Sequence, residues 1–333
     1  MPALPRLGTT LYSFTPEFHG LRYSLADLVR LVAERGLGPG LEMVGFQSVR
    51  GFPHVDPAFA AEFRDLVDRH GLEPSCLAIN VDRAVRRDRV LTGDETVDHL
   101  RAQVDAAVTL GFPLVRVQNL ATVAVMEKLL PHAERVGVTL AMELHAPETV
   151  RSPWVQNLLA FYERAQSERL GFIPDFGAST RRLADSLVEE YRERGVPEDI
   201  LDLGRRTYAA GEHADHLIGE VAASGASMDS VLFIQGVGLF GHQDPQDWRE
   251  IGPWIRHVHG KFYDIDPRGD EPTIDYRAHL ELLVEIGYTG YVSSEWEAWH
   301  WVAEPDAADM ISRHHALERR ILDEIAARPR AAV

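Results

Sequence analysis

The feature that most constrains the fold is a regular alternation of short apolar runs with longer segments of helical periodicity. Such alternation is typical of α/β proteins with a parallel sheet, and eight repeats predict a (β/α)8 TIM barrel. The glycine-rich phosphate turns that mark doubly wound sheets are not found in the sequence. The eight expected strands lie within residues 7–14, 40–46, 74–80, 114–119, 138–145, 171–177, 253–265 and 289–296.

One region, residues 181–250, departs from this alternation. It contains helical stretches such as "SLVEEYRERG" and "EHADHLIGEVAASG", and an apolar run, "SVLFIQGVGLFG", that fits either a strand or a helix. Apolar and helical patterning continues through the region without a linker or a low-complexity tract. We therefore predict a helical insertion between strands six and seven, and a single barrel domain over residues 1–333.

The charge balance narrows the range of partners. The chain has 34 basic and 51 acidic residues and a net charge of -17, which repels phosphate backbones and anionic membrane surfaces. We therefore expect a small-molecule ligand, with no nucleic acid and no membrane. The single cysteine, Cys76, excludes an intrachain disulfide. The N-terminal sequence does not resemble a signal peptide, so a cytoplasmic location is expected.

Titratable side chains stand at the ends of four consecutive predicted strands. Glu143 and His145 are two positions apart in "MELH", so in a strand they share one face. Strand six ends with Asp175, strand seven carries His259, and strand eight ends with Glu295. A barrel brings the carboxyl ends of its strands to one axis, where several carboxylates would repel each other. A divalent cation relieves that repulsion, so Glu143, Asp175, His259 and Glu295 are candidate ligands.

Each of these residues also has a purely structural interpretation. Glu143 and His145 could form the solvent-facing end of a strand, and Asp175 could cap the segment that follows it. The "HVH" pair of strand seven could be hydrogen bonded within the core, and Glu295 could belong to a surface ion pair. For any one residue alone we favour the structural interpretation. Jointly it is weaker, because four consecutive strands would each have to end in a metal-competent group by coincidence.

At these positions the sequence resembles the xylose isomerase-like TIM-barrel superfamily, which includes sugar isomerases, ketose 3-epimerases, inosose dehydratases and type IV apurinic endonucleases. The resemblance is carried by "GLEMVGF", "AMELH", "IPDFG", "RHVHGKF" and "GYVSSEWE". It implies one divalent metal ion, most often Mn²⁺ with Mg²⁺, Co²⁺ or Zn²⁺ as alternatives. The implied ligands are Glu143, Asp175, His259 and Glu295.

Within the superfamily several activities remain open. Ketose 3-epimerases usually carry a histidine three residues after the strand-six Asp, and here that position is Ala178. The negative charge argues against an apurinic endonuclease. The region 181–250 and the aromatic segment "EWEAWHW" resemble the α subunits of bacterial C-glycoside deglycosidases. These enzymes cleave the carbon–carbon bond between a 3-oxo sugar and its aglycone. The resemblance implies a smaller β subunit as partner and an oligomer.

This resemblance implies proton abstraction next to a sugar carbonyl, followed by β-elimination. We expect His145 to be the base, because it shares a face with Glu143. Glu295 and Lys261 are further candidate catalytic residues, and Lys261 could instead hold a sugar hydroxyl. Two alternatives stay open, namely a sugar isomerase or epimerase and a non-catalytic barrel subunit. Candidate substrate-binding residues are Arg116, Gln118, His257, Glu297 and Trp296.

Overall fold

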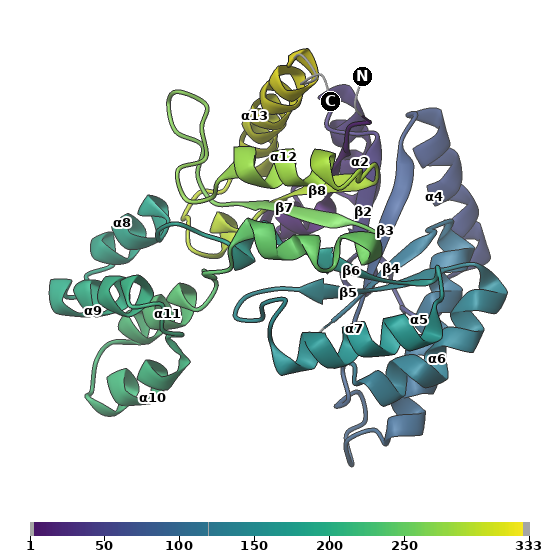
Figure 1. Cartoon of the computed structure of the whole chain (residues 1–333), viewed down its shortest axis with the longest axis horizontal. Helices are drawn as coiled ribbons and strands as arrows, with labels where there is room; N and C mark the ends of the chain where they lie inside the picture. The colour runs from purple at the N-terminus through teal and green to yellow at the C-terminus, as the bar shows by residue number, and fades with distance from the viewer. Residues whose placement is uncertain (1–2, 119, 329–333) are drawn as a thin grey trace.

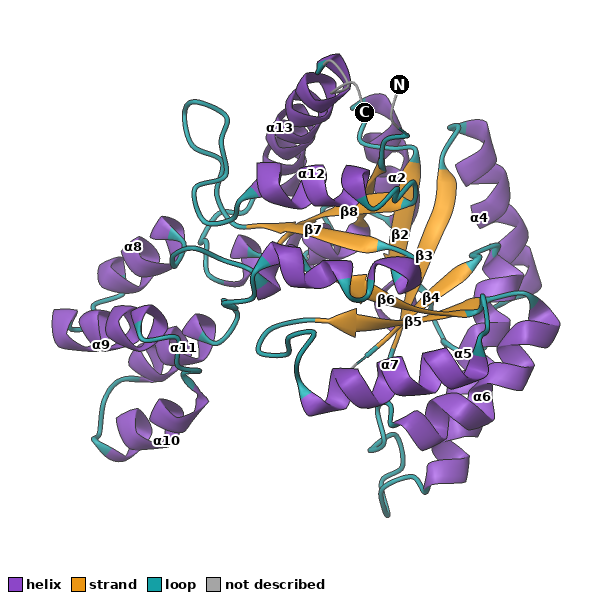
Figure 2. Cartoon of the chain, viewed as in Figure 1, coloured by secondary structure: helices purple, strands orange, loops and turns teal. Residues whose placement is uncertain are grey.

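The computed structural model describes residues 3–118 and 120–328 and shows an eight-stranded parallel sheet curled into a nearly closed barrel (Figures 1 and 2). The predicted α/β barrel is therefore confirmed. Position 119, the expected end of the fourth strand, lies outside the described residues. The strands are β1 (Arg6–Thr10), β2 (Gly40–Val44), β3 (Glu73–Ile79), β4 (Leu114–Val117), β5 (Thr139–Leu144), β6 (Leu170–Pro174), β7 (Val258–Phe262) and β8 (Tyr291–Trp296).

The barrel closes between β6 and β7. The sheet order is β6-β5-β4-β3-β2-β1-β8-β7, and two isolated parallel bridges, Phe172 with Ile255 and Asp175 with His259, join its ends. Gly171 allows this approach, because a Cβ atom there would lie 2.6 Å from the carbonyl oxygen of Trp254. In this order β1 and β5 are four strands apart, so they stand on opposite sides of the barrel.

The first strand is shorter than the predicted 7–14. It ends at Thr10, and residues Leu11–Phe14 form a 3-10 helix instead. The Thr10 hydroxyl accepts a hydrogen bond from the Tyr12 backbone N–H at 3.4 Å, which caps this turn. The strand prediction was wrong here because Leu11 and Phe14 are buried in the turn as well, so apolar periodicity does not reveal it.

Helices cover the outside of the barrel, and local signals explain where several begin and end. Before α5, Thr92 and Glu95 form a capping box, and Gly111 ends the helix in a left-handed conformation. The barrel helices are α1 (Thr15–His19), α2 (Leu25–Glu34), α3 (Gly45–Ser48), α4 (Pro57–Arg69), α5 (Gly93–Leu110), α6 (Val123–Val136), α7 (Pro153–Ala165), α12 (Tyr276–Glu285) and α13 (Ala307–Ala327).

Four helices lie between β6 and β7, in the region 181–250. They group together to one side of the barrel, at the left in Figure 1. The ambiguous apolar run at 230–241 is mostly helical and belongs to the last of them. The four helices are α8 (Asp185–Glu193), α9 (Glu198–Ala209), α10 (Asp215–Ala223) and α11 (Met228–Val237). Within the described residues, no helix combines the length and the apolar character that crossing a bilayer requires.

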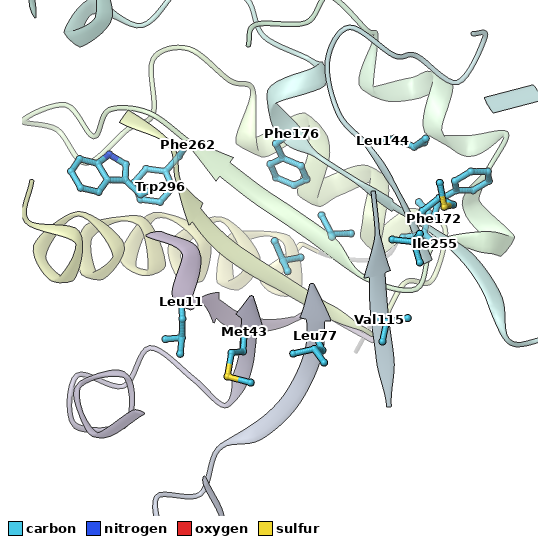
Figure 3. Packing of buried hydrophobic residues seen from close by; sticks show 14 of the residues in the cluster. Leu11, Met43, Leu77, Val115, Leu144, Phe172, Phe176, Ile255, Phe262 and Trp296 are labelled. Atoms are coloured by element: carbon cyan, nitrogen blue, oxygen red, sulfur yellow. The ribbon is translucent and has the colours of Figure 1, made fainter. Parts of the chain in front are cut away.

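Side chains along the strands alternate between two environments. One parity points outward and packs against the helices in the main core, as Met43, Leu77 and Val115 show in Figure 3. The other parity points to the barrel axis. There a second, small apolar cluster fills the interior, made of Cys76, Leu114, Ala141 and Ile173. The polar residues of the same inward parity follow these side chains along their strands, so the apolar cluster forms the floor of a polar site.

Candidate active site

Four titratable side chains from consecutive strands converge above this floor. Glu143 comes from β5, Asp175 directly follows β6, His259 lies in β7 and Glu295 lies in β8. One nitrogen or oxygen atom of each lies within 4.8 Å of those of the other three. The four side chains are at most 12% exposed. They stand beside a cavity of about 570 Å³ at the carboxyl ends of the strands, which Glu143 and Glu295 line directly.

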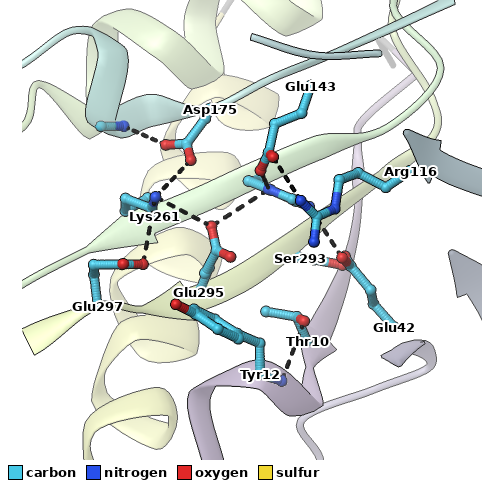
Figure 4. Close-up of polar contacts among 12 residues, drawn as sticks. Thr10, Tyr12, Glu42, Arg116, Glu143, Asp175, Lys261, Ser293, Glu295 and Glu297 are labelled. Carbon is cyan, nitrogen blue, oxygen red and sulfur yellow. Dashed lines mark hydrogen bonds and ion pairs between the residues drawn. The ribbon is translucent and has the colours of Figure 1, made fainter. Parts of the chain in front are cut away.

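His259 lies at the centre of the cluster, between the carboxylates of Glu143 and Glu295, which are labelled in Figure 4. Its Nδ1 atom lies 2.9 Å from Glu143 Oε1 and 3.4 Å from Glu295 Oε2. Burial would lower the pKa of His259, but the carboxylates of Glu295 and Glu42 outweigh it and hold the pKa well above its usual range. Burial also raises the pKa of Glu295 to about 8, although His259 and Lys261 lie beside it. The carboxylates of the cluster thus carry more negative charge than the neighbouring side-chain cations can neutralise.

The residues fit a divalent metal ion. Asp175 Oδ2, His259 Nδ1 and Glu295 Oε2 are buried, and none of them makes a hydrogen bond within the described part of the chain. Their close contacts are ion pairs with Lys261, Glu143 and with one another. A buried polar atom that makes no hydrogen bond is costly, and a cation bound among these three atoms would satisfy all of them. Three carboxylates and one imidazole suit Mn²⁺, Zn²⁺ or Co²⁺. These groups could therefore hold a metal ion, with Glu143 as the fourth ligand.

The two carboxylate oxygen atoms of Asp175 make different contacts, one as a helix cap and one with the cluster. Its Oδ1 atom accepts a hydrogen bond of 2.6 Å from the Gly177 backbone N–H and so caps the short 3-10 turn Phe176–Ala178. Its Oδ2 atom points the other way and lies 2.7 Å from Lys261 Nζ. Capping fixes the carboxylate so that one oxygen always faces the cluster.

Glu42 of β2 holds the two histidines of β7. Its Oε1 atom lies 3.0 Å from His259 Nε2, and its Oε2 atom lies 3.0 Å from His257 Nε2. Burial would raise the pKa of Glu42, but the two imidazoles outweigh it and lower the pKa far below its usual range. Since a carboxylate only accepts, His259 Nε2 must carry a proton. Nδ1 is therefore the atom of His259 that faces the cluster.

His257 lies below the cavity and does not line it. Its ring is 1% exposed, and its Nε2 atom is shared between Glu42 and Ser293 Oγ at 2.9 Å. The expectation that His257 contacts substrate is therefore not supported. Strand parity correctly predicts that the His257 side chain points into the barrel. The residue lies one layer below the cavity, however, and so does not line it.

Lys261 and Glu297 form an ion pair at one side of the cavity. Lys261 Nζ lies 3.4 Å from Glu297 Oε2 and 3.7 Å from Glu295 Oε2. Burial would lower the pKa of Lys261, but Asp175 and Glu297 hold it well above its usual range. Burial would likewise raise the pKa of Glu297, but the Lys261 ammonium lowers it to about 2. Both side chains line the cavity in their charged forms.

His145 lines the same cavity as Glu143, as their spacing predicts. Its Nδ1 atom lies 2.7 Å from the carbonyl oxygen of Ala146. A carbonyl oxygen only accepts hydrogen bonds, so Nδ1 must carry the proton. In the neutral ring Nε2 is then left as an unprotonated acceptor. The geometry thus provides His145 with the tautomer that a base requires.

Arg116 and Gln118 both line the cavity, as expected of substrate-binding residues, but each already has a protein partner. Arg116 donates from Nη1 to Glu143 Oε2 at 2.7 Å. Gln118 accepts a 3.2 Å hydrogen bond from the Val81 backbone N–H through its side-chain oxygen. Arg116 therefore orients Glu143, while the amide nitrogen of Gln118 remains available to a ligand.

Trp296 does not reach the cavity. It has the outward parity of β8, is 2% exposed, and donates from Nε1 to the Tyr263 carbonyl oxygen at 2.9 Å. The expectation that it contacts substrate is therefore not supported. The inward parity of β8 belongs to Glu295 and Glu297, and the alternation along the strand could have excluded Trp296 from the sequence alone.

The cavity also has a wall that the sequence did not reveal. This wall comes from the segments after β1 and β2, where strand prediction extended too far. Tyr12 is its main polar residue, and no sequence motif marks it. The other lining residues of this wall are Thr10, Thr15, His19, Phe46 and Gln47.

The chain matches a known protein family over most of its length. The model of the xylose isomerase-like TIM barrel matches residues 29–314. The chain belongs to this family. The resemblance of the strand motifs is therefore confirmed, and the match spans every strand except β1.

Curated relatives extend the likeness over nearly the full length. A 3'-dehydrocarminate deglycosidase alpha subunit from Microbacterium sp is 46% identical, and the match covers 98% of this chain and 97% of the relative. A C-glycoside deglycosidase alpha subunit from Microbacterium trichothecenolyticum is also 46% identical, over 95% of this chain and 89% of the relative. Both of these relatives, at 46% identity, are thus named as subunits of enzymes.

Solved structures agree on the fold. The IOLI protein, whose crystal structure contains a zinc atom, superposes with a TM-score of 0.58 at 16% identity, over 96% of this chain and 98% of that protein. At this identity the likeness shows the fold alone.

Proposed function

We propose that the chain is the catalytic α subunit of a C-glycoside deglycosidase that acts on 3-oxo C-glycosides by β-elimination. The observation that carries the proposal is the pairing of a metal-competent cluster with His145, whose Nε2 atom is free as an acceptor in the same cavity. The names of the relatives at 46% identity support this choice among the reactions that such a pair can perform.

In this proposal each residue has one task. A divalent ion, Mn²⁺ by preference, would be held by Glu143, Asp175, His259 and Glu295 and would stabilise negative charge on the sugar carbonyl oxygen. His145 Nε2 takes the proton from the carbon next to the carbonyl. The Lys261 ammonium and the Glu297 carboxylate bind sugar hydroxyls, and Gln118 donates its amide N–H.

The direct test is product analysis. Purified protein, with its partner subunit and Mn²⁺, is incubated with a 3-oxo C-glycoside, and free aglycone is quantified by chromatography. We expect release that stops after chelation and returns with added Mn²⁺. Release that is unaffected by exhaustive chelation would contradict the metal-dependent reaction, and its complete absence under all metals would contradict the lyase.

A sugar isomerase or epimerase is the second candidate. The same base beside the same cluster can move a proton between carbons next to a carbonyl, so the geometry fits this reaction too. Ala178 replaces the histidine that ketose 3-epimerases usually carry after the strand-six Asp. Interconversion of free ketoses without release of aglycone would favour this candidate over the lyase.

The remaining features of the proposal concern the assembly. The relatives are named alpha subunits, which supports a smaller partner subunit for this chain as well. We propose a single domain, an oligomer containing both subunits, and a cytoplasmic location. Co-expression with the partner followed by size-exclusion chromatography tests the oligomer, and cell fractionation tests the location.

A further inference from the structure

The Tyr12 hydroxyl stands at the cavity wall with a histidine behind it. Tyr12 follows β1, and its Oη atom lies 2.8 Å from Nε2 of His300, which follows β8. Figure 4 shows the hydroxyl pointing toward the carboxylates of Glu295 and Glu297. Tyr12 lines the cavity, whereas the His300 side chain is 40% exposed. The pair therefore links the cavity to solvent.

The surroundings of Tyr12 hold it in this orientation. The Thr15 hydroxyl donates to the Tyr12 carbonyl oxygen at 2.6 Å, and Gln47 donates to the same hydroxyl at 2.8 Å. The ring of Trp299 packs edge-on against the Tyr12 ring, with centroids 5.3 Å apart. A tyrosine fixed at both its backbone and its ring is positioned to act on a ligand rather than to adapt to one.

The proton of the Tyr12 hydroxyl is available to the cavity. His300 Nε2 lies 3.2 Å from Glu297 Oε1 as well as 2.8 Å from the Tyr12 oxygen. Since the carboxylate only accepts, a proton on Nε2 serves both oxygens, and the O–H of Tyr12 is free to point inward. The other hydroxyl groups of the cavity wall, on Thr10 and Thr15, are aliphatic alcohols and far weaker acids than a phenol.

The position of Tyr12 complements that of His145. Tyr12 follows β1 and His145 follows β5, and these two strands lie on opposite sides of the barrel. A sugar ring between them would present its acidic C–H to one side chain and its leaving group to the other. This arrangement suits elimination, because the base acts at C2 while the acid acts at the aglycone carbon that is bonded to C1.

We infer that Tyr12 is the general acid that protonates the departing carbon of the aglycone, with His300 as its route to solvent. This inference rests on the proposed function. The C2–H bond breaks and its proton goes to His145, while its electron pair forms the C1–C2 double bond. The bond from C1 to the aglycone breaks with its pair, and that carbon takes the Tyr12 proton. Tyr12 regains a proton from water through His300, and nothing is oxidised or reduced.

The test uses Tyr12→Phe in the assembled, metal-loaded enzyme, with Tyr23→Phe, between α1 and α2 of the same β1–α2 connection, as the matched control. Aglycone release from a 3-oxo C-glycoside and exchange of the C2 hydrogen with deuterated water are measured together. Loss of a general acid costs about 10²–10⁴-fold in rate. We expect this loss in aglycone release for Tyr12→Phe, with C2 deprotonation changed less than threefold and Tyr23→Phe unchanged.

A second substrate separates the acid role from a structural one. The 3-oxo glucoside of 4-nitrophenol releases 4-nitrophenolate, a stable anion that needs no proton in order to leave. Tyr12→Phe should therefore release nitrophenolate within about threefold of the wild-type rate, and His300→Gln should show the same selectivity to a smaller degree. Equal losses on both substrates, or undiminished aglycone release, would overturn the Tyr12 assignment. A wild-type enzyme that neither exchanges C2 nor releases aglycone would instead overturn the proposed function.

Discussion

At the scale of single residues, the site depends on which atom of each histidine carries a proton. The Ala146 carbonyl sets the proton of His145 on Nδ1, and the Glu42 carboxylate sets the proton of His259 on Nε2. His145 therefore presents Nε2 to the cavity as a base, whereas His259 presents the opposite nitrogen atom, Nδ1, to the cluster. Two neighbouring acceptors thus assign different tasks to the same kind of side chain.

His145→Ala tests the base. The variant should lose exchange of the hydrogen next to the sugar carbonyl by about 10²-fold or more, since a positioned base contributes that much. Metal content should be unchanged, because the side chain touches none of the four cluster residues through a hydrogen bond in the described structure. Nuclear magnetic resonance of the substrate in deuterated water measures the rate. Exchange at the wild-type rate would rule out His145 as the base.

Glu42→Gln tests how His259 is oriented. An amide can still accept from His259 but brings no negative charge, and groups that support a ligand histidine typically contribute 10–100-fold in metal affinity. We expect Mn²⁺ affinity to fall by about this factor, measured by calorimetry on metal-free protein. Glu73→Gln, an exposed substitution, serves as the control. An unchanged affinity would mean that Glu42 is only a core residue.

At the scale of elements, strand parity carried most of the information in the sequence. The period of two placed Glu143 with His145 and His259 with Lys261, and these pairs do share the inward face. The eight strands were also predictable, because each is a short apolar run bounded by helix signals. The same period places Trp296, next to Glu295, on the outward face, so the expectation that it contacts substrate was wrong.

The sequence does not predict how deep a side chain lies in the barrel interior, or where a strand ends in a turn. Whether His257 or His259 stands at cavity level depends on where β7 begins and how it is staggered against its neighbours, which no local pattern encodes. The turn at Thr10 is decided by one side-chain hydrogen bond within an apolar run. The apolar pattern therefore predicts a strand at Tyr12 and does not reveal the cavity wall that this residue forms.

The closure of the barrel gives a prediction at this scale. Gly171→Ala would place a Cβ atom 2.6 Å from the Trp254 carbonyl oxygen, so β6 and the segment before β7 must separate. We expect a loss of about 1–3 kcal/mol in the free energy of unfolding, as for other overpacked sites. Gly93→Ala is the control, because nothing lies within 4 Å of its Cβ position. Urea denaturation measures both, and equal stabilities would argue against a tight closure.

At the scale of the whole molecule, the barrel brings together negatively charged side chains from several strands. Glu42, Glu143, Asp175 and Glu295 come from four different strands or strand ends, yet all approach His259 or Lys261. The protein has a net charge of -17, so distant surface charge adds to this field rather than opposing it. Stability and metal binding should therefore be coupled through pH.

The pKa of Glu295 determines whether the stability of the metal-free protein rises or falls with pH. In the folded, metal-free protein its pKa is about 8, whereas an unfolded glutamate has a pKa of about 4.3. Between these values the folded state retains a proton that the unfolded state has lost, so stability falls as pH rises toward 8. The raised pKa of His259 acts in the same direction above about pH 6.5. We therefore expect metal-free protein to be less stable at pH 8 than at pH 6.5.

Glu295→Gln isolates the contribution of that carboxyl group. One retained proton corresponds to a slope of at most about 1.4 kcal/mol per pH unit, so the variant should lose about 1.5 kcal/mol less than wild type between pH 6.5 and 8. Urea denaturation of both metal-free proteins at the two pH values measures this difference. Wild-type affinity for Mn²⁺ should rise over the same range, because the ion displaces the retained proton. Parallel stability curves for the two proteins would show that Glu295 is already ionised at pH 6.5, and that the cluster accommodates its charge without a cation.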